Sequence, residues 1–385
     1  MDPAGVYLDH NATTPLAPEA LEAMMPFLRE SFGNPSGASH RHGAEAKEAV
    51  EAARIEVARL MGAGPAEIVF TSCATESNNL AIKGAAWAMR ERGDTIVTTA
   101  IEHKSALGPC RRLESDGFRI RTVGVDRDGR VGPAAVASAI DDRTILVSVM
   151  HANSEVGTIQ DVAAIGRICR EKGVLFHTDA TQSLGKIPVD VGEIGCALLT
   201  ASAHKIYGPK GAGVLYARRR TRLVPLLDGG GQEKDRRSGT LNVPAIVGFG
   251  VACRLARERM ERDAEREQAL RERLREGIFA RIEGVHLNGP LEGRLPGNLN
   301  LSFDGLDGQA LIESLRNVSA SSGSACAAGS TDPSYVLRAM GMSEERAFGS
   351  VRFGIGRGNT GEQIDYAVDE IARAVANLRR LSAAP

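Results

Sequence analysis

Residues 95–123 read TIVTTAIEHKSALGPCRRLESDGFRIRTV, and this stretch decides the fold class. It opens with a β-branched run at 95–99, continues with helical spacing over 104–115 and closes with a second β-branched run at 119–123. Two such runs separated by a helix-length segment are typical of a β-α-β unit, in which both strands lie parallel. The stretch therefore predicts a parallel sheet with a helix packed on it.

The same alternation extends on both sides of this unit. Further strand-like runs occur at 67–72, 145–150, 174–178, 196–200 and 213–217. We therefore expect an α/β fold, with a large domain built on a seven-stranded, mostly parallel sheet that helices cover on both faces. No G-x-G-x-x-G motif follows the first strand, which argues against a nicotinamide-dependent enzyme.

The character of the chain changes after residue 250. Residues 254–276 are highly charged and predict a solvated connecting helix with many i,i+4 pairs. Shorter strands and helices follow, which predicts a smaller α+β domain. We assign 16–250 to the large domain, and 1–15 together with 251–385 to the small domain, which also carries the cysteine at position 326.

Composition excludes several classes of protein. The chain has 385 residues, a net charge of −1 and 43% hydrophobic residues, which excludes wholesale disorder and argues against a nucleic-acid coat. No apolar run approaches the roughly 18 residues of a membrane span. The N-terminus lacks the pattern of a secretory signal, so we expect a cytoplasmic protein. The six cysteines are scattered without a C-x-x-C pair, so neither a disulfide framework nor a metal site is expected.

Lys205 and Asp179 are candidates for one site. Lys205 follows the run at 196–200 and precedes several glycines, where a Schiff-base lysine can lie. Asp179 ends the run at 174–178, at the edge where open α/β sheets bind ligands. A pyridoxal site needs a lysine for the aldehyde and a carboxylate for the ring nitrogen. A solvated lysine and a helix N-cap are the alternatives for these two residues.

Other polar residues also follow strands. Residues 71–78, TSCATESN, combine hydroxyl groups with a helix start, which predicts either a phosphate cradle or a simple capping box. Glu76 fits a cradle only if it points away from the phosphate. His103 is placed to stack on a ring or to move protons, and a surface histidine is the alternative. We expect His177, inside a strand, to be a core residue.

Cys326 and Arg352 complete the set of candidates. Cys326 lies in SSGSACAAG at 321–329, where a thiol on a small, polar loop is a nucleophile candidate or an incidental cysteine. Arg352 lies in the apolar strand SVRFGIG and needs an anionic partner. A substrate carboxylate and a structural ion pair both satisfy that need.

Together these motifs resemble the class V aminotransferase-like pyridoxal enzymes, and within them the cysteine desulfurases of the IscS/NifS type. The motifs are YLDHNATTP at 7–15, FTSCATESNNLAIKG at 70–84, FHTDATQSLGK at 176–186, SAHKIYGPKGAGVLY at 202–216, RSGT at 237–240, SSGSAC at 321–326 and VRFGIGR at 351–357. The resemblance implies a fold type I pyridoxal enzyme that converts L-cysteine to L-alanine. It also implies that the sulfur passes to an acceptor protein, such as an iron–sulfur scaffold.

The resemblance assigns roles to single residues. Lys205 would bind pyridoxal 5'-phosphate, with Asp179 at the ring nitrogen, His103 stacked on the ring and Gln182 at the ring hydroxyl. The phosphate would contact Ala74, Thr75, Ser202, His204 and, from the other subunit of a homodimer, Thr240. Arg352 would bind the carboxylate of L-cysteine, with Asn11, Ala12 and Thr13 nearby. Cys326 would attack the substrate sulfur and become a persulfide.

The chain departs from the family pattern in two places. The usual H-x-N-N-E is here His151-Ala152-Asn153-Ser154-Glu155, so Ser154 stands where an asparagine would contact the ring hydroxyl. A serine is shorter, which predicts a bond that is lost, mediated by water or supplied by Gln182. The sequence also lacks the tail with which some members dock a scaffold, which leaves the acceptor open.

Two other functions stay open. One is a selenocysteine lyase-like, β-eliminating pyridoxal enzyme, although simple elimination needs no persulfide carrier such as Cys326. The other is an inactive interaction partner, in which loss of Lys205, Asp179 or Cys326 is expected, yet all three are present. We expect neither a membrane nor a nucleic acid as a direct partner.

Overall fold

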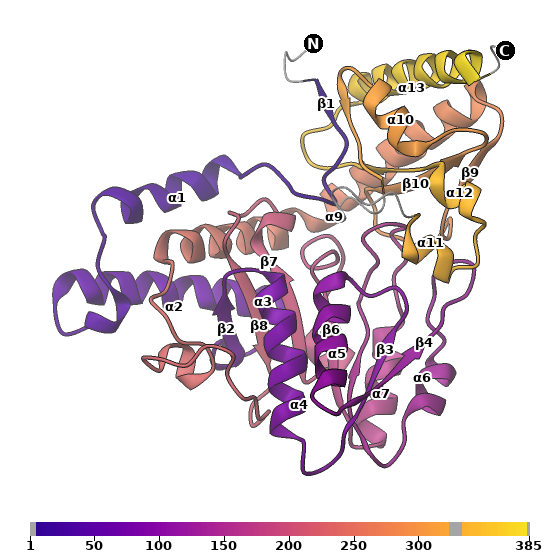
Figure 1. The fold of residues 1–385 in the computed structure, drawn as a ribbon. Coiled ribbons are helices and arrows are strands. Elements are labelled where there is room, and N and C mark those ends of the chain that lie inside the picture. Colours follow the sequence, from indigo (N-terminus) through magenta and orange to yellow (C-terminus); the bar gives the residue numbers. More distant parts are fainter. Residues whose placement is uncertain (1–4, 323–332, 383–385) are drawn as a thin grey trace.

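A computed structural model describes residues 5–322 and 333–382. The larger part of the chain surrounds one broad sheet, and a smaller sheet lies beside it together with β1 (Val6–Tyr7) and α13 (Gly361–Ser382) (Figure 1). None of the helices in these two ranges is both long and apolar enough to cross a bilayer.

The large sheet has seven strands in the order β2-β8-β7-β6-β5-β3-β4. The strands are β2 Ile68–Thr71, β3 Thr95–Thr99, β4 Arg119–Val123, β5 Thr144–Ser148, β6 Leu175–Asp179, β7 Leu198–Ser202 and β8 Gly213–Ala217. Only β8 runs against its two neighbours, β2 and β7, and the other pairs are parallel. The predicted seven-stranded, mostly parallel sheet is confirmed.

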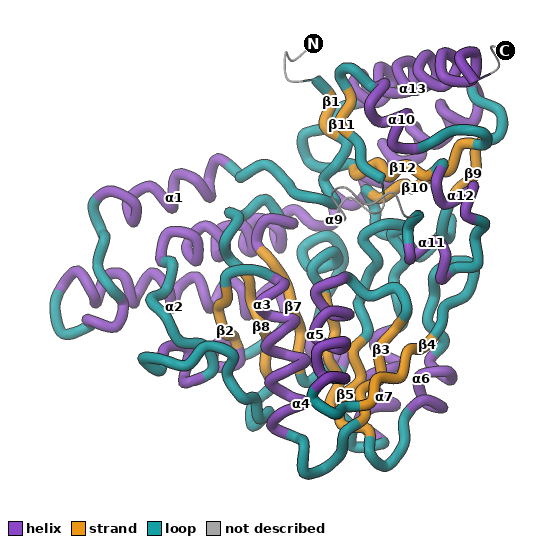
Figure 2. Tube along the Cα trace, viewed as in Figure 1, coloured by secondary structure: helices purple, strands orange, loops and turns teal. Residues whose placement is uncertain are grey.

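Helices cover both faces of this sheet because alternate strand residues point to opposite sides. Val97 and Leu199 are buried in a core shared with α2 (Arg41–Met61), α7 (Val162–Glu171) and α9 (Val243–Arg281). Ile96 and Leu198 face the opposite core, which includes α5 (Lys104–Ser115). The same core receives α4 (Ala85–Ala88) and the π-helical turn Leu80–Gly84, which joins α4 to α3 (Ala74–Asn79) (Figure 2).

The small sheet is antiparallel, in the order β12-β10-β9. Its strands are β9 Val285–Leu287, β10 Asn298–Phe303 and β12 Ser350–Gly354. It packs with α10 (Gly308–Ser314) and α13, and β1 pairs in parallel with β11 (Val318–Ser319). Val6 and Leu8 are buried in this core, so the start of the described chain packs with its end. The domain limits at 16–250 and 251–385 stay a prediction.

Helix α9 is longer than the charged stretch predicted. It begins after Asn242, whose side chain accepts a hydrogen bond from Ala245 N at 3.2 Å. The apolar residues before the charged stretch form its first turns, and Phe249 and Cys253 are completely buried. The helix packs against α1 (Pro18–Arg29) and α2 with its first half and against α13 with its second half. A solvated connecting helix was therefore only part of the answer.

The remaining helices are short. They are α6 Pro133–Ala139, α8 Val191–Ile194, α11 Tyr335–Ala339 and α12 Glu344–Phe348, with 3-10 turns at Pro35–Gly37, Pro65–Glu67, Ala203–Lys205 and Gln232–Asp235. His177 lies in β6 within hydrogen-bond distance of Ser148 and Thr200 and is fully buried, as expected of a core histidine.

The small sheet depends on the close packing of β10, which gives a stability prediction. Leu299 is completely buried, so Leu299→Ala should lower the free energy of unfolding by about 2–5 kcal/mol, through lost transfer energy and the cavity left behind. Leu291 is 53% exposed, and Leu291→Ala should stay close to the wild type. Urea unfolding of both variants measures the difference, and equal losses would contradict the assigned core.

Candidate functional site

Polar side chains gather where strands of the large sheet end. Strands β2, β3, β6 and β7 run in the same direction, so their carboxyl ends lie at one edge. Arg352 reaches the same place from β12 of the small sheet. The resulting cavity has a volume of about 340 Å³.

This cavity brings together most of the residues predicted from the sequence. Asn11, Ala12, Ala74, Thr75, His103, Ser154, Asp179, Gln182, His204, Lys205 and Arg352 line it. Thr13, Ser202 and Thr240 are not among its lining residues. Cys326 falls outside the described residues, so its predicted place at the site stays a prediction.

Three predicted residues therefore lie away from the cavity wall. Thr13 is directly behind it, with its Oγ1 3.1 Å from Nδ1 of His204. Ser202 is buried at the end of β7 and donates to the carbonyl of Ala212 at 3.3 Å. Thr240 is exposed, in the segment that leads into α9.

Lys205 is positioned by the N-terminal segment. A single 3-10 turn, Ala203–Lys205, follows β7 and brings the side chain to the sheet edge. Its Nζ donates to the carbonyl oxygens of Asn11 at 2.8 Å and Ala12 at 2.5 Å. Gln182 holds the same segment, since its Nε2 donates to the Asn11 carbonyl at 3.0 Å.

Asp179 is a buried carboxylate held by uncharged donors. Its Oδ2 accepts from Asn78 Nδ2 at 2.7 Å, and its Oδ1 accepts from Thr181 N at 2.9 Å. The side-chain oxygens of Asn78 and Thr181 are themselves buried without a partner among the described residues. A buried carboxylate needs a cation for full compensation, so this wall of the cavity suits a positively charged ligand atom.

His103 belongs to the same hydrogen-bond network. It caps α5 by accepting from Ser105 N at 3.1 Å, and its Nδ1 lies 2.7 Å from Ser105 Oγ. Ser105 Oγ accepts from Asn78 Nδ2 at 2.8 Å, which links His103 to Asp179 through Asn78. His103, which follows β3, and Asp179, at the end of β6, are thus held in fixed relative positions.

The start of α3 forms part of the cavity wall. Cys73 precedes the helix without a side-chain cap, so the first N–H groups remain for an anion. Gly213 of β8 lets the backbone at Cys73 pack closely against it, because a Cβ at residue 213 would lie 2.5 Å from the Cys73 carbonyl carbon. Glu76 turns away and binds Arg237 Nε at 2.8 Å and Ser72 N at 2.8 Å.

His204 stands beside Lys205 as an uncharged group. Burial, assisted by the positive charges of Lys205 and Lys210, lowers the pKa of His204 to about 4. The imidazole is therefore neutral at pH 7 and offers a hydrogen bond rather than a charge.

Arg352 makes the structural ion pair that was one of the two roles the sequence left open. Its Nη2 binds Asp9 Oδ1 at 2.9 Å and donates to Ser321 Oγ at 2.7 Å, and its Nη1 donates to the Ser154 carbonyl at 3.1 Å. The structural ion pair is therefore present. The Nε–H is buried without a hydrogen-bond partner among the described residues, and the side chain lines the cavity. An additional anionic ligand fits that donor.

Two residues of the site were missed by the sequence analysis. Asn78 bonds Asp179 directly, and its spacing of four residues from Ala74 places both on one helix face, a signal that was readable. Glu155 lines the cavity, accepts from Ser334 Oγ at 2.5 Å and is 4% exposed. Burial raises the pKa of Glu155 to about 7. Glu155 ends the motif at 151–155, but the sequence analysis assigned it no role.

Known proteins with similar sequences and structures place the chain in context. The model of the Aminotransferase class-V family matches residues 6–367. A protein of Anaeromyxobacter dehalogenans (strain 2CP-C) named Cysteine desulfurase IscS is 53% identical over 381 residues, which cover 98% of this chain and 94% of that protein.

Two solved structures are also close. A NifS-like protein superimposes with a TM-score of 0.91 at 39% identity and covers 97% of this chain and 100% of its own. A structure described as SspA in complex with cysteine gives a TM-score of 0.82 at 38% identity, covering 91% of this chain and 99% of its own.

Glu155 gives a prediction about pH. The folded state keeps its proton up to about pH 7, whereas the usual glutamate value is 4.5, so stability falls as pH rises through this window. Glu155→Gln stays neutral and should gain stability relative to the wild type between pH 5 and 8, by up to about 3 kcal/mol.

Denaturant unfolding at several pH values measures this difference. The exposed Glu313→Gln is the matched control and should differ from the wild type by the same amount at each pH. A pH-independent difference for Glu155→Gln would show that this carboxyl does not keep its proton.

Proposed function

The chain belongs to the class-V aminotransferase family, and we propose that it is a cysteine desulfurase, which converts L-cysteine to L-alanine and keeps the sulfur as a persulfide on Cys326. One observation carries the proposal. A lysine, a buried carboxylate and an arginine with a buried N–H to spare meet in a single cavity. Relatives over almost the full length bear the same activity in their name.

Members of this family generally use pyridoxal phosphate, and the residues of the cavity fit it. Lys205 would bind the aldehyde, and Asp179 would supply the negative charge that a protonated ring nitrogen needs. Ala74, Thr75 and the neutral His204 would hold the phosphate at the start of α3, with His103 on the ring and Ser154 and Gln182 near its hydroxyl. When bound, the cofactor supplies an electron sink for bonds broken at the substrate.

The chain's own residues do the remaining work. Arg352 binds the substrate carboxylate, which fixes the amino acid between the two sheets, with Asn11, Ala12 and Thr13 beside it. The amine of Lys205 holds and returns a proton beside the reacting carbon. The Cys326 thiolate attacks the sulfur of the substrate, so that an S–S bond forms and the Cβ–S bond breaks. The electron pair of the broken bond stays with the substrate and, with a proton, gives L-alanine.

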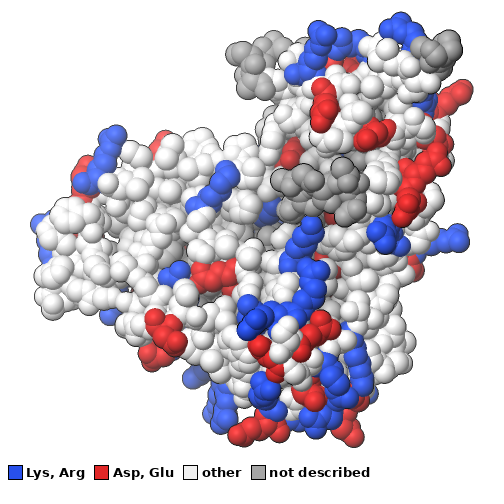
Figure 3. All heavy atoms as spheres, in the orientation of Figure 1, with Lys and Arg blue, Asp and Glu red and all other residues white. Residues whose placement is uncertain are grey.

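We further propose that the protein acts as a cytoplasmic homodimer. Leu28 and Phe32 are 56% and 75% exposed beside α1, where Figure 3 shows a broad area with few charged side chains. Exposed apolar area of this kind favours association. Thr240 would contact the phosphate bound to the partner. The persulfide passes to an acceptor protein, for which an iron–sulfur scaffold is our first choice.

The role of Cys326 is tested by substitution. With pyridoxal phosphate, L-cysteine and a reductant, the wild type should form alanine and sulfide in equal amounts. Cys326→Ser should bind as much cofactor as the wild type but form both products only at background level. Equal turnover would exclude the persulfide, and product from L-selenocysteine alone would favour a selenocysteine lyase.

The role of Lys205 is tested by cofactor retention. Lys205→Ala should lose pyridoxal phosphate on dialysis, because the covalent attachment is gone. Lys210→Ala, an exposed lysine five residues further on, should retain it. Absorbance of the dialysed proteins measures the retained cofactor, and mass spectrometry after borohydride treatment locates it. Attachment at another lysine would contradict the assignment.

A further inference from the structure

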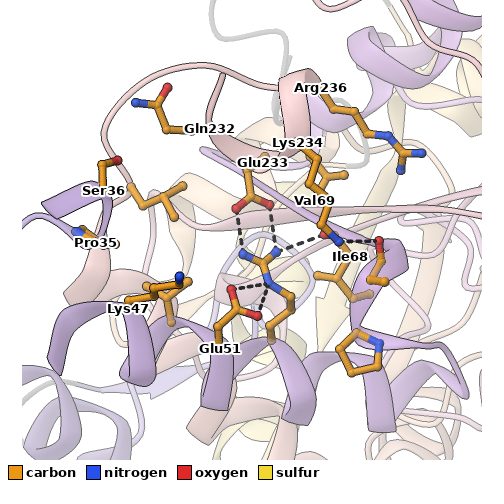
Figure 4. A pocket seen from close by; sticks show the side chains of 15 residues that line it. Pro35, Ser36, Lys47, Glu51, Ile68, Val69, Gln232, Glu233, Lys234 and Arg236 are labelled. Carbon is orange, nitrogen blue, oxygen red and sulfur yellow. Dashed lines mark hydrogen bonds and ion pairs between the residues drawn. The ribbon is translucent and has the colours of Figure 1, made fainter. Parts of the chain in front are cut away.

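A second pocket, of about 350 Å³, lies at the outer edge of the large sheet, away from the site described above (Figure 4). It is centred on an ion pair between α2 and the segment that precedes α9. Arg54 of α2 binds both carboxylate oxygens of Glu233, at 2.8 and 2.9 Å. Figure 4 shows Glu233 and Glu51 on opposite sides of the arginine that both contact.

This ion pair is buried. The side chain of Arg54 is 9% exposed and that of Glu233 only 2%. Arg54 also lies over the ring of Phe70, 4.7 Å from its centre. A forked, desolvated pair of this kind fixes geometry more strictly than a surface pair does.

The pair also completes the edge of the sheet. Strand β2 is the last strand on its side, so one row of its backbone groups has no neighbouring strand. Glu233 accepts from Phe70 N at 2.7 Å, and Arg54 donates to the carbonyl of Ile68 at 3.0 Å. The two side chains thus take the place of a neighbouring strand at residues 68 and 70.

The backbone around Glu233 is strained to make these contacts. Glu233, Lys234 and Asp235 have φ values of 50°, 60° and 62°, in the left-handed region that favours glycine. Each such residue costs roughly 1–2 kcal/mol, and three in succession persist only where the surroundings impose them. The ion pair with Arg54 and the bond to Phe70 N both hold this turn.

The segment that carries Glu233 also reaches the start of α3, where we propose that the phosphate binds. Arg237, four residues after Glu233, binds Glu76 at 2.8 Å, and Glu76 accepts from Ser72 N at 2.8 Å. Strand β2 itself leads directly into Cys73 and Ala74, which line the cavity. Arg54 and Glu233 contact β2, and Arg237 contacts Glu76 in α3. These contacts therefore hold residues 68–76 at both ends.

We propose that Arg54 and Glu233 are positioning residues that hold the phosphate end of the cofactor cavity from outside. The inference rests on the proposed function, since it assumes that pyridoxal phosphate binds at the start of α3. Neither residue lines that cavity, and both act through β2 and through the segment that carries Arg237 and continues to Thr240.

The test is the affinity of the cofactor-free, full-length protein for pyridoxal phosphate, measured by equilibrium dialysis. Glu233→Gln keeps the size of the side chain but removes its charge, and should raise Kd about tenfold, the lower end of the effect of removing groups that orient ligand-binding residues. Arg54→Lys keeps the charge but loses the forked contact, and should act in the same direction. Glu51→Gln alters the half-exposed partner of the same arginine and should change Kd less than twofold.

A merely structural role predicts a different result. It lowers the melting temperature of Glu233→Gln and Arg54→Lys but leaves Kd at the wild-type value, and that outcome overturns the proposal. Unfolding of both variants overturns it as well. A wild type that does not bind pyridoxal phosphate refutes the proposed function instead, so the two failures are distinguishable.

Discussion

The site depends on one buried carboxylate. Asp179 lies at the end of β6 with both oxygens on uncharged donors, Asn78 and Thr181. Burying a charge costs free energy, so the surrounding groups must donate hydrogen bonds to it. Asn78 fixes the rotation of α3, and Ser105 links the network to His103, which follows β3. The position of several strand ends is thus tied to a single negative charge.

The second requirement is that two sheets meet. Lys205 comes from the large sheet and Arg352 from the small one, and the N-terminal segment bonds to both parts of the chain. The carbonyl of Asn11 accepts a hydrogen bond from Lys205, and the carboxylate of Asp9 pairs with Arg352. A short segment near the start of the chain therefore sets the separation of Lys205 and Arg352. This is why motifs far apart in the sequence form one cavity.

The sequence predicted the strands and most of the cavity wall, because both follow from local patterns. β-branched runs mark strands, and residues just after parallel strands must share an edge. It did not predict the ion pair of Arg54 and Glu233, because the two residues are 179 positions apart in the chain. It also did not predict that the apolar residues before the charged stretch, which include several glycines and alanines, form the buried first turns of α9. Glu155 stands in the motif at 151–155, but its raised pKa comes from burial, which the motif does not reveal.

Helix α9 has a mechanical consequence. Its 39 residues make a rod of about 58 Å that packs on the large part of the chain with one half and on the small part with the other. A change in the angle between the two sheets must bend this rod or break its packing. The elastic stiffness of one helix therefore limits how far thermal motion can open or close the cavity between the two sheets.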